Sequence, residues 1–176
     1  MVNLCLAHYN TLMRQIVIIV HDIRSCHNVG SLFRTAEGMG VAKVYLTGYT
    51  PYPIVPDDQR LPHIANKLTK QISKTALGAE EHIEWEYTED ISKLIEQLKS
   101  QSFVVAGLEQ SSGSIKLPDY KTPDKLALVL GREVEGIDPH IQKACDVLVE
   151  IPMFGKKESF NVVQAAAIAL YHCRFC

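Results

Sequence analysis

The sequence predicts an α/β fold of three layers, with helices covering both faces of a parallel sheet. Short apolar segments recur along the chain, as at 16–20 (IVIIV) and 126–130 (LALVL). They are apolar throughout rather than alternating, which is typical of strands buried on both faces of a sheet. Segments with the apolar spacing of helices separate them, and strands that alternate with helices favour a parallel sheet.

The elements can be placed in order along the chain. After the first strand, apolar residues at helical spacing predict a helix over 29–38, which Asn28 can cap and which Gly38 and Gly40 end. Gly78 closes a second helix, and a turn is predicted at 111–114 (SSGS). The other predicted strands are 43–47, 83–87, 103–107 and 147–151, and the other predicted helices are 67–77, 91–98 and 161–171. Neither a repeat nor a linker interrupts the pattern. We therefore expect one domain over 1–176, with 1–13 as a peripheral N-terminal extension.

Composition excludes several classes of protein. The chain has 176 residues, 47% hydrophobic and 22% charged, as in ordinary globular domains. No apolar run reaches the ~20 residues of a membrane span, and the first residues do not resemble a secretory signal. We therefore expect no membrane partner, and the odd number of cysteines favours the reduced thiols of a cytoplasmic protein. The five cysteines include one isolated CxxC at 173–176, which lacks the partners of a zinc site, so no metal is expected.

Charge gives no sign of a nucleic-acid binder. The net charge is −2 and the pI is about 6.4. Proteins that bind nucleic acid are usually basic, so any basic surface for RNA has to be local.

The last predicted helix has almost no polar face. Its sequence at 162–170 is VVQAAAIAL. A helix that is apolar on all sides is buried on all sides. Two explanations remain open: a helix that docks between its own sheet and a partner subunit, and an ordinary internal core helix.

Polar residues follow the first predicted strand, at the sheet edge where ligands of open parallel sheets bind. The segment 21–38 reads HDIRSCHNVGSLFRTAEG. Gly30 permits a close approach of the backbone. Arg34 lies less than two helical turns beyond Asn28 and could reach back to the strand end. An arginine on a helix is, however, more often a solvated surface charge.

Two further segments follow strands in the same way. The segment 130–137 (LGREVEGI) has two glycines around a turn whose backbone could contact a ligand, but it is neither a P-loop nor GxGxxG. In the segment 151–162 (IPMFGKKESFNV), Ser159 and Asn161 precede the last helix. One of them could be its N-cap. Two such residues exceed the needs of capping and suggest a ligand at the helix N-terminus.

Taken together, these segments resemble the three motifs of the SpoU/TrmH family of SPOUT RNA 2'-O-ribose methyltransferases. The motifs are NVGSLFR, GREVEG and IPMFG followed by SFNVVQAAAIALY, in this order over about 16–175. The resemblance implies a trefoil knot in the C-terminal part, where S-adenosylmethionine would bind. It also implies a homodimer, because the motif-one arginine and the knot motifs of this family meet across the subunit interface.

The resemblance assigns roles to individual residues. Arg34 would be catalytic, either by activating the ribose 2'-hydroxyl or, because arginine is a poor base, by binding an RNA phosphate and orienting the hydroxyl. The other polar positions of the active site would be Asn28, Glu133, Ser159 and Asn161. The cofactor site would be lined by Leu108, Gly131, Gly136, Ile151, Met153 and Phe160.

The chain departs from the family pattern without losing a catalytic group. Phe160 replaces a leucine and could reshape the cofactor pocket, and Val134 stands where glycine is common. Val163 and His172 replace a serine and a glutamate. Candidate RNA contacts near the strand ends are Arg24, His27, Arg132, Lys156 and Lys157. For Lys67, Lys70 and Lys74 a solvated helix face is the favoured interpretation.

The expected function is methyl transfer from S-adenosylmethionine to a ribose of tRNA or rRNA, with tRNA favoured. The alternative is a catalytically silent SPOUT-like dimer that binds RNA, although Asn28, Arg34 and Asn161 argue against it. A nucleotide-binding protein of the Rossmann type is a second alternative. It is disfavoured because GxGxxG is absent after the first strand and Thr47-Gly48 replace the acidic residue after the second.

Overall fold

The computed structural model describes residues 14–176, which form one parallel sheet of seven strands between two layers of helices. The strand order is β3-β2-β1-β6-β4-β7-β5, and every neighbouring pair is parallel. The predicted α/β class and its three layers are therefore confirmed. The proposed extension at 1–13 lies outside the described residues.

Most of the strands and helices predicted from the sequence are present in the structure. The strands are β1 (Gln15–His21), β2 (Lys43–Thr47), β3 (Trp85–Thr88), β4 (Val104–Leu108), β5 (Ile115–Lys116), β6 (Lys125–Leu130) and β7 (Val147–Glu150). The helices are α2 (Cys26–Gly38), α3 (Pro62–Ala76), α4 (Ala79–His82), α5 (Ile91–Ser100), the 3₁₀ helix η2 (Leu117–Asp119), α6 (Pro139–Ala144) and α7 (Val162–Phe175).

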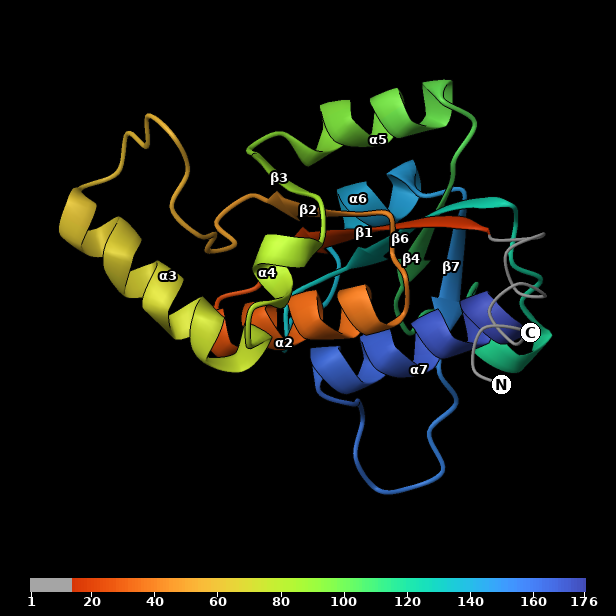
Figure 1. Cartoon of the computed structure of the whole chain (residues 1–176). Helices are drawn as coiled ribbons and strands as arrows, with labels where there is room; N and C mark the ends of the chain where they lie inside the picture. Colours follow the sequence, from red (N-terminus) through yellow and green to blue (C-terminus); the bar gives the residue numbers. More distant parts are fainter. Residues whose placement is uncertain (1–13) are drawn as a thin grey trace, which may run out of the picture.

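The sheet divides the hydrophobic core into two parts. Helices α2 and α7 cover one face, and α5 and α6 cover the other (Figure 1). Alternate residues of β1 point to opposite sides: Ile16 and Ile18 belong to the core under α2 and α7, whereas Val17 and Ile19 belong to the core under α5 and α6. Both faces of the strand are buried, which explains why its sequence is apolar throughout.

The start of α2 corrects one prediction. The helix begins at Cys26, and its N-cap is Ser25, whose hydroxyl accepts a hydrogen bond from the Asn28 backbone N–H at 3.2 Å. Asn28 is therefore inside the helix and is not its cap. Because serine already satisfies the helix N-terminus, the Asn28 side chain is free for other contacts.

Other boundaries differ for physical reasons. Helix α3 begins five residues before the predicted start, at Pro62, a residue well suited to the first turn. It ends at Ala76 and is followed by its C-cap Leu77, which adopts the left-handed conformation with φ 54°, next to Gly78. β5, α4, α6 and η2 were not predicted, because these elements are too short to show a periodic pattern.

Within one chain, α7 is buried on one side only. Ala166, Ala169 and Leu170 are fully buried, whereas Ile168 is 39% and Tyr171 57% exposed. The expectation of burial on all sides is thus wrong for the single chain. None of the described helices is long and apolar enough to cross a membrane.

Hydrogen bonds join the C-terminal end of α7 to the residue before β1 and to the residues that follow α2. The Arg174 guanidinium donates hydrogen bonds to the carbonyls of Met39, Gly40 and Arg14. In return, the Arg14 guanidinium donates to the carbonyls of Cys173 and Cys176. These two arginines join the start of β1, the end of α2 and the end of α7.

Candidate active site

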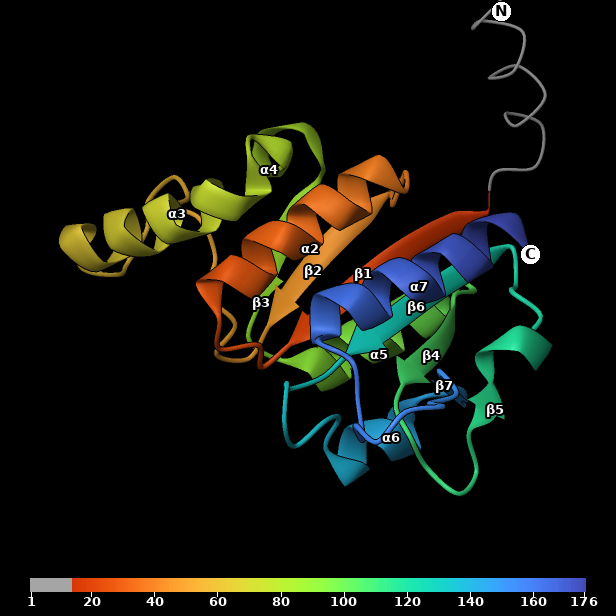
Figure 2. The ribbon, with the colours of Figure 1, turned by 90° about the horizontal axis from the view of Figure 1, so that it is seen from below.

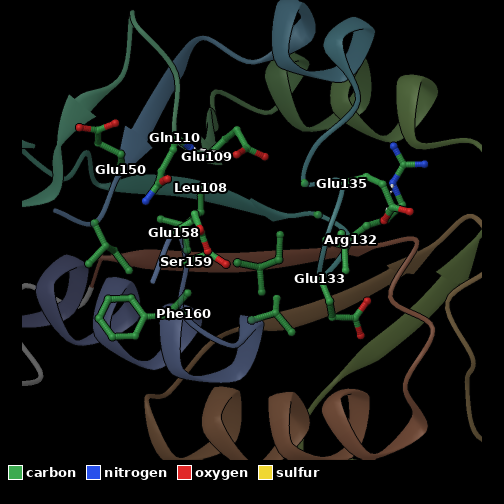
Figure 3. Close-up of a pocket in the computed structure, with 17 residues that line it drawn as sticks. Leu108, Glu109, Gln110, Arg132, Glu133, Glu135, Glu150, Glu158, Ser159 and Phe160 are labelled. Carbon is green, nitrogen blue, oxygen red and sulfur yellow. Dashed lines mark hydrogen bonds and ion pairs between the residues drawn. The ribbon is translucent and has the colours of Figure 1, made fainter. Parts of the chain in front are cut away.

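A cavity of about 260 Å³ lies where β4, β6 and β7 end, beside the first turn of α7. Ligands of open α/β sheets bind at these carboxyl ends. Its apolar wall comes from Leu108, Leu130, Ile151, Phe160 and Val162. Its polar residues include Glu109, Gln110, Arg132, Glu133, Glu135, Glu150, Glu158 and Ser159 (Figure 3).

The loop between β6 and α6 forms the floor of the cavity and requires two glycines. Arg132 and Gly136 pair with each other, backbone N–H to carbonyl, at 3.1 Å in both directions. This pairing folds the loop back onto Gly131, where a Cβ would lie 2.6 Å from the backbone of Gly136 and Ile137. Gly136 has φ +70°, a conformation that side chains disfavour.

Glu109 fixes this loop and was missed in the sequence. Its carboxylate accepts hydrogen bonds from the backbone N–H groups of Ile137 at 2.6 Å and Gln110 at 2.9 Å. The same carboxylate occupies the space that a side chain at Gly136 would need. The available signal was its position directly after an apolar strand, at the sheet edge where ligands bind.

A chain of side-chain hydrogen bonds connects the three sequence motifs. Asn28 Nδ2 donates to Glu133 Oε1 at 2.9 Å, and Asn161 Nδ2 contacts Asn28 Oδ1 at 3.4 Å. Asn161 is also the N-cap of α7, since its Oδ1 accepts from the Val163 N–H at 2.9 Å. Residues that are more than one hundred positions apart in the sequence thus meet at the rim of the cavity.

The lining of the cavity is acidic. Five glutamates contribute to it, namely Glu109, Glu133, Glu135, Glu150 and Glu158, against one arginine. That arginine, Arg132, forms ion pairs with Asp138 and, at 4.0 Å, with Glu135. An apolar wall beside excess carboxylates favours a ligand that combines a flat or apolar part with positive charge.

The structure brings most of the expected site residues to this cavity. Leu108, Gly131, Gly136, Ile151 and Phe160 line it, as do Glu133 and Ser159. Asn28 and Asn161 lie at its rim through their hydrogen bonds with Glu133 and with each other.

Met153 and Arg34 do not line the cavity of their own chain. Met153 lies in the loop after β7, which projects from the fold (Figure 1). Arg34 is exposed on α2 and does not line the cavity, so its reach back to the strand end stays a prediction. The sequence reasoning also missed Gln110, Glu150 and Glu158 as lining residues.

A second polar group stabilises the neighbouring strand end. Ligand-type atoms of His21, Asp22 and Asp138 lie within 4.8 Å of one another. Each group already has a partner: His21 Nδ1 contacts Thr47 Oγ1 at 2.9 Å, Asp22 Oδ1 accepts from the Tyr49 N–H at 3.0 Å, and Asp138 pairs with Arg132. Burial lowers the pKa of His21, so the neutral ring is favoured.

Comparison with known proteins identifies related sequences. The model of the SpoU rRNA methylase family matches residues 15–171. A Staphylococcus aureus protein named for the TrmH family of tRNA/rRNA methyltransferases is 31% identical over 158 residues, covering 88% of this chain and 56% of the relative. A 23S rRNA (guanosine-2'-O-)-methyltransferase of Neisseria meningitidis is 32% identical over 159 residues, covering 90% and 58%. The chain therefore spans little more than half the length of these relatives.

Solved structures show the same fold. An AdoMet-bound rRNA methyltransferase from Sinorhizobium meliloti superposes with a TM-score of 0.78 at 19% identity, covering 92% of this chain and 56% of that one. The TrmH/SpoU tRNA modifying enzyme of A. aeolicus has a TM-score of 0.74 at 19% identity, covering 98% and 81%. The family match extends from β1 into α7 and includes all three motifs that meet at the cavity. The chain therefore belongs to the SpoU rRNA methylase family.

Proposed function

We propose that this protein is an S-adenosylmethionine-dependent RNA ribose 2'-O-methyltransferase that works as a homodimer. The observation that carries the proposal is the hydrogen-bonded chain Glu133–Asn28–Asn161 at the rim of an acidic cavity. It unites the three family motifs at one sheet edge. The related proteins named as RNA methyltransferases add support.

The cavity suits S-adenosylmethionine, which carries a flat adenine, a ribose and a positively charged sulfonium. Leu108, Ile151 and Phe160 offer the apolar wall for the adenine. The glutamates offset the positive charge. Gly131 and Gly136 keep the floor free of side chains, so the ligand can approach the loop backbone. When bound, S-adenosylmethionine supplies a methyl group on a positively charged sulfur, which the ribose oxygen accepts.

The residues at the rim prepare the ribose hydroxyl. The hydroxyl loses its proton as the new C–O bond forms, and the methyl–sulfur bond would break so that S-adenosylhomocysteine leaves. The Glu133 carboxylate is held in place by Asn28 and can accept that proton. Because the arginine side chain is a poor base, Arg34 binds an RNA phosphate and orients the ribose rather than accepting the proton.

The dimer explains the position of Arg34. Helices α2 and α7 lie side by side on one face of the sheet (Figure 2). Arg34 is exposed there, and so are the apolar side chains of Ile168 and Tyr171 on α7. A second copy that covers this face would bury the apolar stripe and bring Arg34 of one subunit to the cavity of the other.

We further propose the family's trefoil knot for the C-terminal part. Strand β7 lies beyond β4, and the chain then returns across the sheet to α7, which packs against α2. The His172 ring contacts the carbonyl of Tyr120 at 2.9 Å, so α7 also reaches the segment before β6. This return path past the 109–124 connection is what a threaded C-terminus requires.

The RNA substrate is tRNA or rRNA, and tRNA is favoured. A folded RNA with an unpaired loop offers both shape and accessible bases to a small domain. Both RNAs are present in the cytoplasm, which is the compartment we propose. Lys156 and Lys157 are exposed in the loop after β7, beside the motif that opens α7, and are candidates for phosphate contacts.

The test is transfer of labelled methyl to bulk tRNA and bulk rRNA. Wild type is compared with Arg34→Ala and with Lys93→Ala, a control for an exposed cation on α5, on the other face of the sheet. We expect label in an alkali-resistant 2'-O-methylated dinucleotide for wild type and Lys93→Ala but not for Arg34→Ala. Calorimetric binding of S-adenosylhomocysteine by all three proteins shows whether the cavity is intact. Binding of S-adenosylhomocysteine and RNA without any transfer would favour the catalytically silent alternative.

A mixing experiment tests the shared site. Arg34→Ala and Gly131→Ala are each expected to be inactive as pure dimers, the second because its cavity floor is displaced. If Arg34 acts on the partner's cavity, equal mixing restores about a quarter of the wild-type activity, through one complete site in each mixed dimer. Restoration of no activity, with mixed dimers verified by mass spectrometry, would place Arg34 and its cavity in the same subunit.

A further inference from the structure

The loop after β2 builds an aromatic hollow that the methyl-transfer site does not use. The hollow is lined by Arg24, Tyr49, Tyr52, Arg60 and Tyr87, together with Gly48, Thr50, Pro51 and Leu68. Three tyrosines and two arginines therefore gather at one place on the surface.

One side of the hollow is rigid. Tyr52 stacks on Tyr87 with ring centroids 4.1 Å apart and an angle of 22° between the rings. The Arg60 guanidinium covers the ring of Tyr52 at 3.6 Å and pairs with Asp58 at 2.5 Å. Arg60 also donates hydrogen bonds to the carbonyls of Tyr52 and Pro53. These contacts brace the long β2–α3 loop, and they give Tyr52 and Arg60 a structural role.

Tyr49 is different, because its backbone is fixed while its ring is half exposed. Asp22 accepts a hydrogen bond from the Tyr49 N–H at 3.0 Å, and the Tyr87 hydroxyl donates to the Gly48 carbonyl at 2.8 Å. Gly48 has φ +64°, and a Cβ there would lie 1.9 Å from the Asp22 carboxylate. Tyr49 as a whole is 50% exposed. A half-exposed aromatic side chain on a fixed backbone offers a surface on which a nucleobase can stack.

Arg24 connects the hollow to the methyl-transfer cavity. Its guanidinium lies 5.7 Å from the centre of the Tyr49 ring and pairs at 3.9 Å with Glu135, which lines the cavity. Both side chains of this ion pair are well exposed, so the pair is weak and easily exchanged for a phosphate.

We propose that the hollow binds an unpaired nucleobase of the RNA substrate, next to the methylated nucleotide, with the base stacked on Tyr49 and its phosphate held by Arg24. The inference rests on the proposed RNA methyltransferase function and adds a recognition site to it. Stacking tolerates any base, because every base has a π face. The hollow therefore selects for an unpaired nucleotide beside the target rather than for one sequence.

The experiment measures RNA binding without methyl transfer. Fluorescently labelled bulk tRNA is titrated with protein saturated with S-adenosylhomocysteine. We expect Tyr49→Ala to weaken binding by about fivefold or more, the equivalent of one lost stacking contact, and Tyr49→Phe to bind within about twofold of wild type. Leu61→Ala is the control, because Leu61 is 60% exposed nearby but does not line the hollow. Transcripts that contain 4-thiouridine are expected to crosslink on irradiation to a peptide containing Tyr49.

The possible failures are distinguishable. If Tyr49→Ala binds RNA as wild type does while methyl transfer persists, the hollow is not a base site and the proposed function stands. If both Tyr49 variants lose RNA binding equally, stacking is not the cause and the inference is wrong. If wild type binds neither RNA nor S-adenosylhomocysteine, the proposed function fails and this inference fails with it.

Discussion

Replacement of Gly131 by alanine tests the reasoning about the cavity floor. The added Cβ would lie 2.6 Å from backbone atoms of Gly136 and Ile137, closer than real Cβ atoms approach. Those atoms cannot withdraw without breaking the Arg132–Gly136 pairing or the hydrogen bond from Ile137 N–H to Glu109. Overpacking of this kind costs about 1–3 kcal/mol. For a domain of this size, this corresponds to a Tm lower by about 2–12 °C.

The assay for Gly131→Ala combines thermal unfolding with calorimetric binding of S-adenosylhomocysteine. We expect a lower Tm and strongly weakened binding, because the displaced loop fills the space that the ligand needs. Gly113→Ala is the matched control, since a Cβ at Gly113 has open space around it, and its Tm and ligand affinity should equal those of wild type. A Gly131→Ala protein with wild-type Tm and wild-type affinity would refute the steric argument.

Three further predictions concern stability. Glu109→Ala leaves the buried Ile137 N–H without an acceptor and should lower the free energy of unfolding in urea by about 1–3 kcal/mol. Glu109→Gln keeps an acceptor oxygen and should lower it less. Equal losses of stability in the two variants would contradict this role of Glu109. Gly38→Ala on α2 meets no neighbouring atom and should stabilise the protein by about 0.4–1 kcal/mol; a lower urea midpoint would show the reasoning to be wrong. Burial lowers the pKa of His21 below the usual 6.5, so the unfolded chain binds the extra proton first and stability should fall as the pH drops below that value. A His21→Asn variant should show a shallower dependence of the unfolding free energy on pH, and an unchanged slope would exclude His21 as its source.

The fold was largely predictable because strands that are buried on both faces of a sheet are apolar at every position. The three central strands β1, β6 and β4 consist largely of continuous apolar runs. The edge strand β5 has two residues, both exposed, and its sequence carries no such record. Short helices such as α6 likewise have too few turns to show a period.

The candidate site was predictable only where motifs mark it. The glycines of the 130–137 loop and the asparagines of the first and third motifs were identified from sequence, and the last two prove to be hydrogen-bonded to each other. Glu150 and Glu158 carry no local pattern, because a lone glutamate looks like any solvated charge, and for the same reason the position of Glu109 after an apolar strand is a weak signal. Their common property is position at one sheet edge, which requires the strand order. For Arg34 the reverse holds: the motif identifies the residue, but within the described residues of its own chain no side-chain partner shows what it contacts.

The contacts between the end of α7 and the start of β1 affect the order in which the chain can fold during synthesis. Strand β1 is made early, yet it pairs with β6, and the core above it is closed by residues of α7. Arg14, directly before β1, hydrogen-bonds to carbonyls at positions 173 and 176. Contacts between residues this distant in sequence form slowly, because the intervening chain has to be ordered first. Most of the sheet is therefore synthesised before α7 can cover its face of the sheet. In that interval the exposed apolar face makes the nascent chain prone to aggregation and dependent on chaperones.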